Sequence, residues 1–311
     1  VRADDAVLRG FFNVCQHRAH DLAPRDVTTE HRSIHCPYHG WRYGLDGTLL
    51  STPRFTAPAG FDRAHHGLVA VPVEEWHGWI MVNASGDAPP VGEHLSGIEP
   101  HVADHEPERL VVGATHTYEV AANWKLVVEN YQECVHCPHI HPELCRVSPS
   151  TSGENHVGHE GFWVGGWQDL MPHAATMSLD GTSPTTPLRR LRGVARRRID
   201  YIGLLPNMRV SLHPDYVMTH RVAPVAAGRT VVECQWLFAP EAVAATGFDP
   251  AFAVDFWDLT NRQDWAACES VQRGLSSRGF RQGPFSVDED AVAQFVRLVA
   301  HAYRAGGWTR P

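Results

Sequence analysis

Two short segments of the chain each combine a cysteine with a histidine, and this repeated pairing is the strongest constraint that the sequence sets. One residue separates Cys15 from His17, and two residues separate Cys36 from His39. Hydrophobic packing does not require such a pattern, whereas a metal centre does, because thiolate and imidazole are common metal ligands. The sequence therefore predicts a metal site that is built from two loops.

The composition of this site favours an iron–sulfur cluster over zinc. Two thiolates and two imidazoles match a two-iron, two-sulfide cluster in which one iron takes the cysteines and the other takes the histidines. Zinc fingers instead pair Cys with Cys and His with His, whereas each loop here mixes the two. Gly40 and Gly44 suit the tight turns of such a loop, and Trp41 is expected to pack at its base.

The order of the predicted elements indicates an all-β part followed by an α+β part. Residues 7–83 contain short strand-like segments, with Asp46-Gly47 as a hairpin signal, and residues 85–108 form a linker with one short helix. The later part alternates strand patterns with helical ones. Strands are expected within residues 110–120 and 161–238, and helices within 123–137, 249–273 and 288–304.

Composition narrows the classes of protein to consider. The net charge of −8 argues against a nucleic-acid partner, and no apolar run is long enough to predict a membrane span. The seven cysteines are an odd number, which favours reduced thiols in a cytoplasmic protein over a disulfide framework. The chain begins at Val1 without a methionine, so we expect that further residues precede it.

A second group of candidate ligands lies in "ENYQECVHCPHIHP", residues 129–142. On a helix, Glu129, Glu133 and His136 share one face, and Pro138 then releases the chain so that His141 can return to the same metal. Two histidines need one carboxylate from elsewhere to form a facial triad for Fe(II), which leaves positions open for O2 and substrate.

The alternative for the same segment is a zinc knuckle, and its ligands would be Cys134, His136, Cys137 and His141. Four ligands within eight residues are too crowded for one tetrahedron on a helical turn, which argues against this alternative. Cys134 and Cys137 are then expected to be packed thiols beside the site.

Together these motifs carry a resemblance to a known family. "CQHRAHDL" and "CPYHGWRYGLDGTL" resemble the Rieske domain of ring-hydroxylating and N-demethylating non-haem iron oxygenases. The family's acid-x2-His-x4-His motif is similar to Glu133, His136 and His141. The resemblance implies that both histidines bind iron and that Glu133 has a catalytic role, bridging to a Rieske histidine of a neighbouring subunit. It implies Asp264 as the third ligand, with Asp258 and Asp255 as alternatives.

The resemblance also implies the fold and the partners. We expect an all-β Rieske domain over residues 1–105, N-terminally incomplete, and an α+β catalytic domain over 106–311, which is an antiparallel sheet with helices of a helix-grip kind. The implied cofactors are a [2Fe-2S] cluster held by Cys15, His17, Cys36 and His39, and a mononuclear Fe(II). No GxGxxG run is present, so electrons are expected from a separate flavin or ferredoxin-type reductase. A homotrimer, or a multiple of it, is implied.

The expected activity is hydroxylation or oxidative N-demethylation of a small quaternary amine, because later segments resemble the glycine betaine, carnitine and stachydrine oxygenases. Two alternatives stay open, namely a hydroxylase or dioxygenase of an aromatic or natural product and a non-enzymatic redox or zinc-binding module. Asn123 is a candidate to hydrogen-bond the site or to cap its helix. The candidate aromatic residues for a cation pocket are Trp163, Trp167, Tyr201 and Tyr216.

Overall fold

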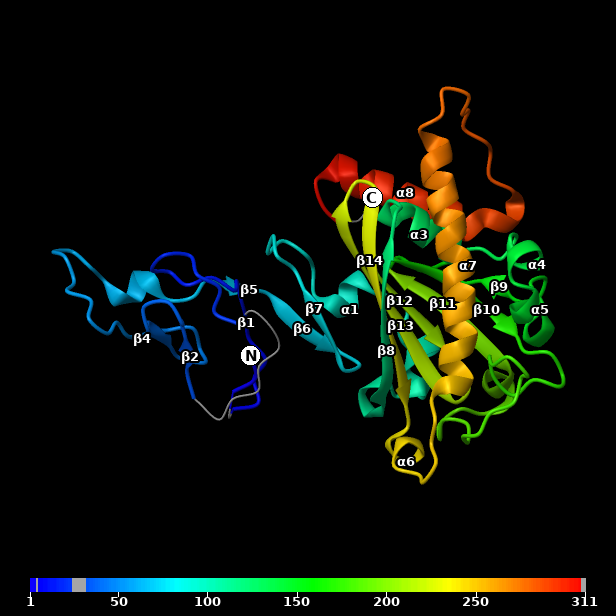
Figure 1. Ribbon diagram of the computed structural model, residues 1–311, viewed down its shortest axis with the longest axis horizontal. Helices are drawn as coiled ribbons and strands as arrows, with labels where there is room; N and C mark the ends of the chain where they lie inside the picture. The colour runs from blue at the N-terminus through cyan, green and yellow to red at the C-terminus, as the bar shows by residue number, and fades with distance from the viewer. Residues whose placement is uncertain (4, 24–31, 309–311) are drawn as a thin grey trace. The chain divides into compact units, whose positions relative to one another are not determined.

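The computed structural model describes residues 1–3, 5–23 and 32–308, and the chain forms two compact units that divide between Val91 and Gly92 (Figure 1). This division precedes the expected boundary at 105/106. Residues 92–105 look like a linker in sequence, but they carry the short helices α1 (Val91–His94) and α2 (Glu99–Val102). Leu95 and Ile98 are buried there, so hydrophobic burial joins this segment to the second unit.

The first unit consists of short antiparallel strands, as the sequence predicts. The turn at Asp46-Gly47 connects two of them, and Gly47 has a φ of +88°, which explains the glycine. Cys15 and Cys36 lie in the small core of this unit, beside Trp41. The strands are β1 Gly10–Phe11, β2 Ile34–His35, β3 Arg42–Tyr43, β4 Leu49–Ser51, β5 Ala70–Val71, β6 Val73–Trp76 and β7 Trp79–Val82, with a 3-10 turn at Arg63–His66.

The second unit contains a seven-stranded sheet in the order β8-β14-β13-β12-β11-β10-β9, and all of its pairs are antiparallel. The expected antiparallel sheet with helices is therefore confirmed. The strands are β8 Val111–Val120, β9 Glu154–Asn155, β10 Trp163–Asp169, β11 Arg198–Leu204, β12 Met208–Leu212, β13 Tyr216–Ala226 and β14 Arg229–Phe238.

Helices cover this sheet, and α7 runs across it in Figure 1. They are α3 Trp124–Tyr131, α4 Cys137–Ile140, α5 Pro142–Val147, α6 Pro240–Val243, α7 Ala251–Leu275 and α8 Asp290–Ala305, with 3-10 turns at Ala103–His105, Pro107–Arg109, Gly193–Arg197 and Val287–Glu289. The two C-terminal helices match the sequence prediction, whereas α3 ends at Tyr131 rather than near 137. No helix among the described residues is long and apolar enough to cross a membrane.

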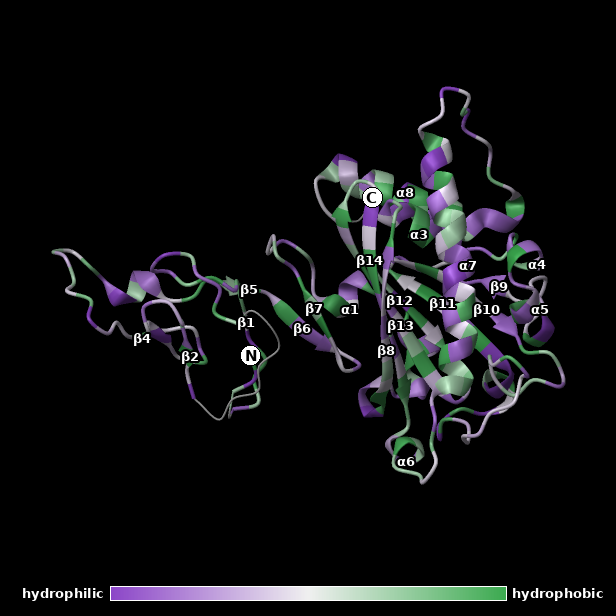
Figure 2. Ribbon diagram, viewed as in Figure 1, coloured by the Kyte–Doolittle hydropathy of each residue, from purple (hydrophilic) through white to green (hydrophobic). Residues whose placement is uncertain are grey.

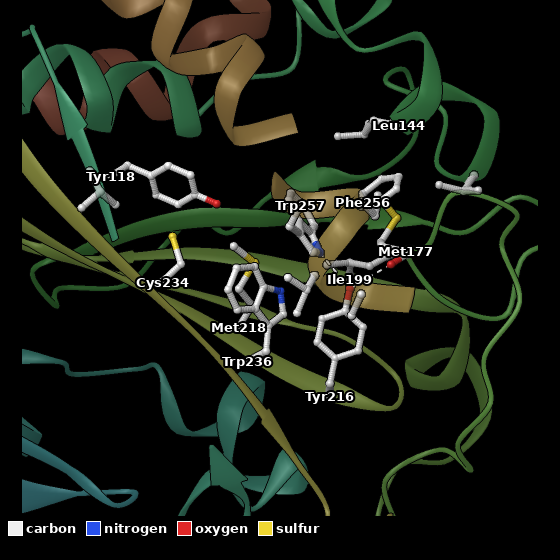
Figure 3. Packing of buried hydrophobic residues seen from close by; sticks show 14 of the residues in the cluster. Tyr118, Leu144, Met177, Ile199, Tyr216, Met218, Cys234, Trp236, Phe256 and Trp257 are labelled. Atoms are coloured by element: carbon white, nitrogen blue, oxygen red, sulfur yellow. Dashed lines mark hydrogen bonds between the residues drawn. The ribbon is translucent and has the colours of Figure 1, made fainter. Parts of the chain in front are cut away.

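One face of the sheet forms the main core against α7 (Figure 3). Side chains alternate between the faces of a strand, so the even-numbered residues of β13 and β14 point to the same side. Register pairs Tyr216 with Phe238 and Met218 with Trp236, and all four are fully buried. Figure 2 shows that hydrophobic and hydrophilic bands alternate along α7. This alternation is typical of a helix that packs one face against a core.

Replacing Phe238 with alanine should destabilise the second unit by about 3–5 kcal/mol, the usual cost of deleting a buried aromatic side chain. Its ring packs 5.1 Å from that of Phe248 and 5.7 Å from that of Tyr216. The matched control is Val112→Ala on the neighbouring strand, where the side chain is half exposed, and that change should stay within about 0.5 kcal/mol. Urea unfolding followed by circular dichroism measures both, and equal midpoints would contradict the packing described.

Candidate metal centres and catalytic cavity

Four potential ligands meet in the first unit. Cys15 and Cys36 are each 2% exposed and carry free thiols. The rings of His17 and His39 lie 4.6 Å apart between centroids. The Nδ1 atoms of both rings are buried without a hydrogen-bond partner in the described part of the chain. Buried ring nitrogens normally have partners, so two unpaired nitrogens next to two buried thiols fit a metal cluster that would use all four as ligands.

The surroundings of these loops hold the four side chains in place. Trp41 stacks on the ring of His17 at 4.7 Å, in the packing role that the sequence predicts. The hydroxyl of Tyr43 lies 3.2 Å from the sulfur of Cys15 and accepts a hydrogen bond from the backbone N–H of Gln16. Burial lowers the pKa of His17, which favours the neutral imidazole that a metal ligand must be.

The second unit brings His136, His141 and Asp264 together, as the motif predicts. The Oδ1 atom of Asp264 lies 2.8 Å from Nε2 of His141 and 3.4 Å from Nε2 of His136. With metal–ligand bonds of about 2.0–2.2 Å, one ion could contact all three donors. The donor set of two imidazoles and one carboxylate is that of the facial triad of non-haem iron enzymes.

These three residues come from two elements. Asp264 lies in the middle of α7, while the histidines follow α3. The expected helical face through Glu129, Glu133 and His136 is not present, because α3 ends at Tyr131. Glu133 and His136 instead lie in the turn before α4, and His141 lies between α4 and α5. A turn, and not a helix, therefore brings Glu133 and His136 together.

The outer nitrogens of both histidines are held by hydrogen-bond partners. Nδ1 of His136 pairs with a carboxylate oxygen of Glu133, and Nδ1 of His141 lies 2.7 Å from Oε1 of Gln263. Such partners fix the tautomer and leave Nε2 free for a metal. The sequence prediction did not include Gln263. Its position directly before Asp264 was the available signal, but helical neighbours point in different directions and only the structure shows the contact.

The electrostatics of the triad are those of an ionised carboxylate between imidazoles. Burial lowers the pKa of His136, but its hydrogen bonds with Asp264 and Glu133 outweigh burial and raise the pKa to about 9. Burial raises the pKa of Asp264, and the hydrogen bonds with both histidines reverse this and bring the pKa below its ordinary value. Without a metal the site thus holds a proton that a metal ion would displace.

Cys134 and Cys137 form a disulfide, so the prediction of two packed free thiols is wrong. Their Cα atoms lie 4.9 Å apart in the turn before α4, within the range that a disulfide requires. The sequence argument assumed a helix here, whereas the two cysteines lie in a turn that aims their sulfur atoms at each other. A zinc knuckle would need both as thiolate ligands, so this arrangement also disfavours that alternative.

A cavity of about 710 Å³ opens beside the triad. Glu133, His136, His141 and Asp264 all line it. Two of the four aromatic residues predicted for a cation pocket, Trp167 and Tyr201, line the cavity as well.

The other two predicted pocket residues lie in the core and do not line the cavity. The buried ring of Trp163 stacks on His159 at 3.6 Å. The hydroxyl of the buried Tyr216 donates to the backbone carbonyl of Met177 and accepts from the Trp257 indole. The prediction missed two aromatic cavity residues, Tyr131 and Trp257, because apolar positions on a helix look like ordinary core.

The remaining candidates have structural contacts. Asn123 caps α3, where its Oδ1 accepts from the N–H of Lys125 at 3.1 Å and its Nδ2 donates to the carbonyl of Ala227. Neither of these two bonds reaches the triad. Asp258 pairs with Arg262, and Asp255 is exposed, so neither alternative carboxylate joins the two histidines.

Comparison with known proteins agrees with this geometry. A family model for the catalytic domain of ring-hydroxylating alpha subunits matches residues 107–305, and a Rieske [2Fe-2S] domain model matches residues 1–71. The glycine betaine monooxygenase oxygenase subunit of Pseudomonas aeruginosa is 29% identical over 315 residues, which cover 92% of this chain and 72% of that protein. The carnitine monooxygenase oxygenase subunit of Escherichia coli is 30% identical over 319 residues, covering 98% and 80%.

A solved structure gives the same result. The crystal structure of a quaternary ammonium Rieske monooxygenase with a bound inhibitor superposes with a TM-score of 0.81 at 27% sequence identity, covering 97% of this chain and 80% of that one. The resemblance inferred from the motifs is thereby confirmed. The chain belongs to the Rieske oxygenases with a ring-hydroxylating alpha-subunit catalytic domain, which are oxidoreductases.

Proposed function

We propose that the chain is the terminal oxygenase of a multicomponent system and that it oxidises a small quaternary amine which also carries a carboxylate. His136, His141 and Asp264 would bind Fe(II). The ligands of the [2Fe-2S] cluster would be Cys15, His17, Cys36 and His39. The observation that carries the proposal is the meeting of two Nε2 atoms with one carboxylate oxygen at 2.8 and 3.4 Å beside a large cavity.

When bound, the two centres supply electron storage and O2 activation, because a facial set of three ligands leaves open positions for O2 and substrate. The role of the protein is to position these groups. Glu133 holds the Nδ1 proton of His136, so this imidazole presents Nε2 to the cavity. In the proposed homotrimer, Glu133 also links this histidine to His17 or His39 of a neighbouring subunit, and a separate reductase supplies the electrons.

The walls of the cavity suit a cationic group. Acidic side chains line it at Glu154, Asp288 and Asp290, and none of the described lining residues is Lys or Arg. Tyr201 and Trp257 add aromatic faces, which attract quaternary ammonium groups. Hydroxylation of an N-methyl carbon would give a hemiaminal, which collapses to formaldehyde and the demethylated amine.

A buried arginine supports the presence of a carboxylate on the substrate. Arg209 is 1% exposed, and its Nε and Nη2 atoms have no hydrogen-bond partner in the described residues. It lines a small cavity of about 20 Å³ that shares Asn130, Tyr131, Trp257 and Asp264 with the large one. Burial lowers the pKa of Arg209 to about 10, so it stays charged at neutral pH. A buried, unpaired charge is costly, and a substrate carboxylate would provide the missing partner.

The relatives agree with this substrate class. Two relatives are named glycine betaine and carnitine monooxygenase oxygenase subunits, and the chain covers more than two thirds of each. The acidic and aromatic lining of the cavity and the buried Arg209 support the same substrate class for this chain.

Asp264→Ala should remove the catalytic iron and leave the Rieske chromophore intact. The wild type is expected to contain about three iron and two acid-labile sulfide ions per chain, and the variant about one iron fewer with unchanged sulfide. Elemental analysis and the visible spectrum measure this. Asp258→Ala is the matched control, because its carboxylate lies on the same helix and pairs with Arg262. Wild-type iron content and turnover in the Asp264 variant would refute the assignment.

Glu133→Gln should keep both metals and slow the transfer of electrons to the catalytic iron. Loss of a carboxylate that holds a metal-bound histidine commonly costs about ten- to a hundredfold. Single-turnover product formation with a pre-reduced cluster measures the step. The control is Glu143→Gln on α5, a residue that does not line the cavity. Unchanged single-turnover rates in the Glu133 variant would rule out the bridging role.

Formaldehyde should be released from glycine betaine or carnitine in the presence of a surrogate reductase, and choline should be a poorer substrate because it lacks the carboxylate. Arg209→Met should raise KM for the carboxylated amines about tenfold or more, since a charged hydrogen bond contributes about 1.5–3 kcal/mol, and should change KM for choline much less.

Arg221→Met is the control for this substitution, because Arg221 is exposed and pairs with Glu233. Equal effects of Arg209→Met on choline and the carboxylated amines would contradict the role of Arg209. Oxidation of aromatic compounds, with no formaldehyde from any amine, would contradict the substrate class.

A further inference from the structure

A second set of two imidazoles and one carboxylate is present in the second unit, away from the catalytic triad. Donor atoms of His101, His156 and Asp200 all lie within 4.8 Å of one another. His101 belongs to α2, His156 directly follows β9, and Asp200 lies on β11. Three separate segments of the chain therefore each contribute one potential ligand atom to this group.

Strand alternation places Asp200 on the face of the sheet opposite to Tyr201. Successive residues of a strand point to opposite faces. On β11, Tyr201 lines the cavity, so Asp200 points to the other side. Trp163 is also on that side, with its ring 5.6 Å from that of His101 and 5.9 Å from that of His156. The set is thus distinct from the proposed iron site.

Two of the three donor atoms already lie as close as two ligands of one ion would, and the third ring is next to them. Nε2 of His156 lies 2.9 Å from Oδ1 of Asp200, and the rings of His101 and His156 lie 3.8 Å apart between centroids. The side chains of His156 and Asp200 are 13% and 19% exposed. An ion from solvent could reach them, while the packing against Trp163 limits their freedom to move away.

A buried histidine lies near this set without joining it. His105 follows His101 by four residues along the consecutive helical segments 99–102 and 103–105, and it is 5% exposed. Its ring nitrogens are not among the donor atoms that lie within 4.8 Å of one another, so the set has three members.

The charge of the set also suits a cation. In the described part of the chain, the ion-pair partner of Asp200 is His156, and no Lys or Arg neutralises this carboxylate. Zinc commonly binds histidine nitrogens together with a carboxylate oxygen, and other first-row transition metal ions accept the same ligands.

We propose that His101, His156 and Asp200 bind a divalent first-row transition metal ion such as Zn²⁺. This ion would be separate from the iron of the oxygenase site. It would tie α2, at the start of the second unit, to the β9–β11 edge of the sheet, and its role would be structural.

The test uses the full chain loaded with its iron centres. The protein is equilibrated with Zn²⁺, passed through a desalting column, and analysed for zinc and iron. The wild type should retain a zinc ion per chain and gain thermal stability from it, because ligands that bind only the folded state raise Tm. Asp200→Asn should lose the zinc, with affinity lower by at least about tenfold, while keeping its iron and its Rieske spectrum.

Three further variants make the result decisive. Asp258→Asn is the matched control, because Asp258 forms another His–Asp pair, with His116 at 3.5 Å, and the described residues offer this pair no third ligand. It should retain zinc like the wild type. Asp264→Ala should show the reverse of Asp200→Asn, losing catalytic iron and keeping zinc. His156→Ala should also lose the zinc, so the site is tested even if one variant folds poorly.

Equal zinc retention in the wild type and Asp200→Asn would overturn the proposal. So would zinc that disappears only in Asp264→Ala, because the metal would then occupy the oxygenase site. Neither result bears on the oxygenase function, which is tested by iron content and turnover.

Discussion

The carboxylate of Asp264 is the contact on which the arrangement of the proposed oxygenase site depends. It joins α7 to a turn that is far away in sequence, through His136 and His141. The helix is held against the sheet by a continuous apolar face, and this packing fixes the position of the carboxylate. The two histidines come from a segment without long secondary structure, and their outer hydrogen bonds to Glu133 and Gln263 replace the rigidity that a helix would have provided.

Neighbouring residues of one strand in the antiparallel sheet contribute to two different sites, the large cavity and the proposed second metal site. Tyr201 and Arg209 point toward the face covered by α3 and α7, where the large cavity lies. Asp200 points to the other face and meets histidines from α2 and from the segment after β9. Because neighbouring residues of a strand point to opposite faces, Tyr201 can line the cavity while Asp200 contributes a ligand to the second site. Both residues belong to β11.

The sequence predicted which side chains lie together better than it predicted their local structure. The cysteine and histidine pairs could be identified from their spacing, because metal ligands are restricted in type and order, and the family resemblance pointed to Asp264, which the structure brings next to both histidines. The end of α3 at Tyr131 and the disulfide between Cys134 and Cys137 could not be predicted, because helical periodicity does not indicate where a helix ends. Arg209 and Trp257 were missed because their importance depends on long-range contacts within the sheet and helices.

The charges around the cavity explain why one substrate could satisfy groups that the protein leaves unpaired. Ion pairs with the histidines keep Asp264 ionised, and burial keeps the nearby His220 neutral, with a pKa of about 4. Arg209 lies over the Tyr131 ring, 5.6 Å from its centroid, but no carboxylate among the described residues pairs with it, while the outer walls carry an excess of carboxylates. A ligand of one sign would correct only one of these imbalances. A zwitterion whose carboxylate reaches Arg209, and whose ammonium group remains among aromatic and acidic side chains, would correct both.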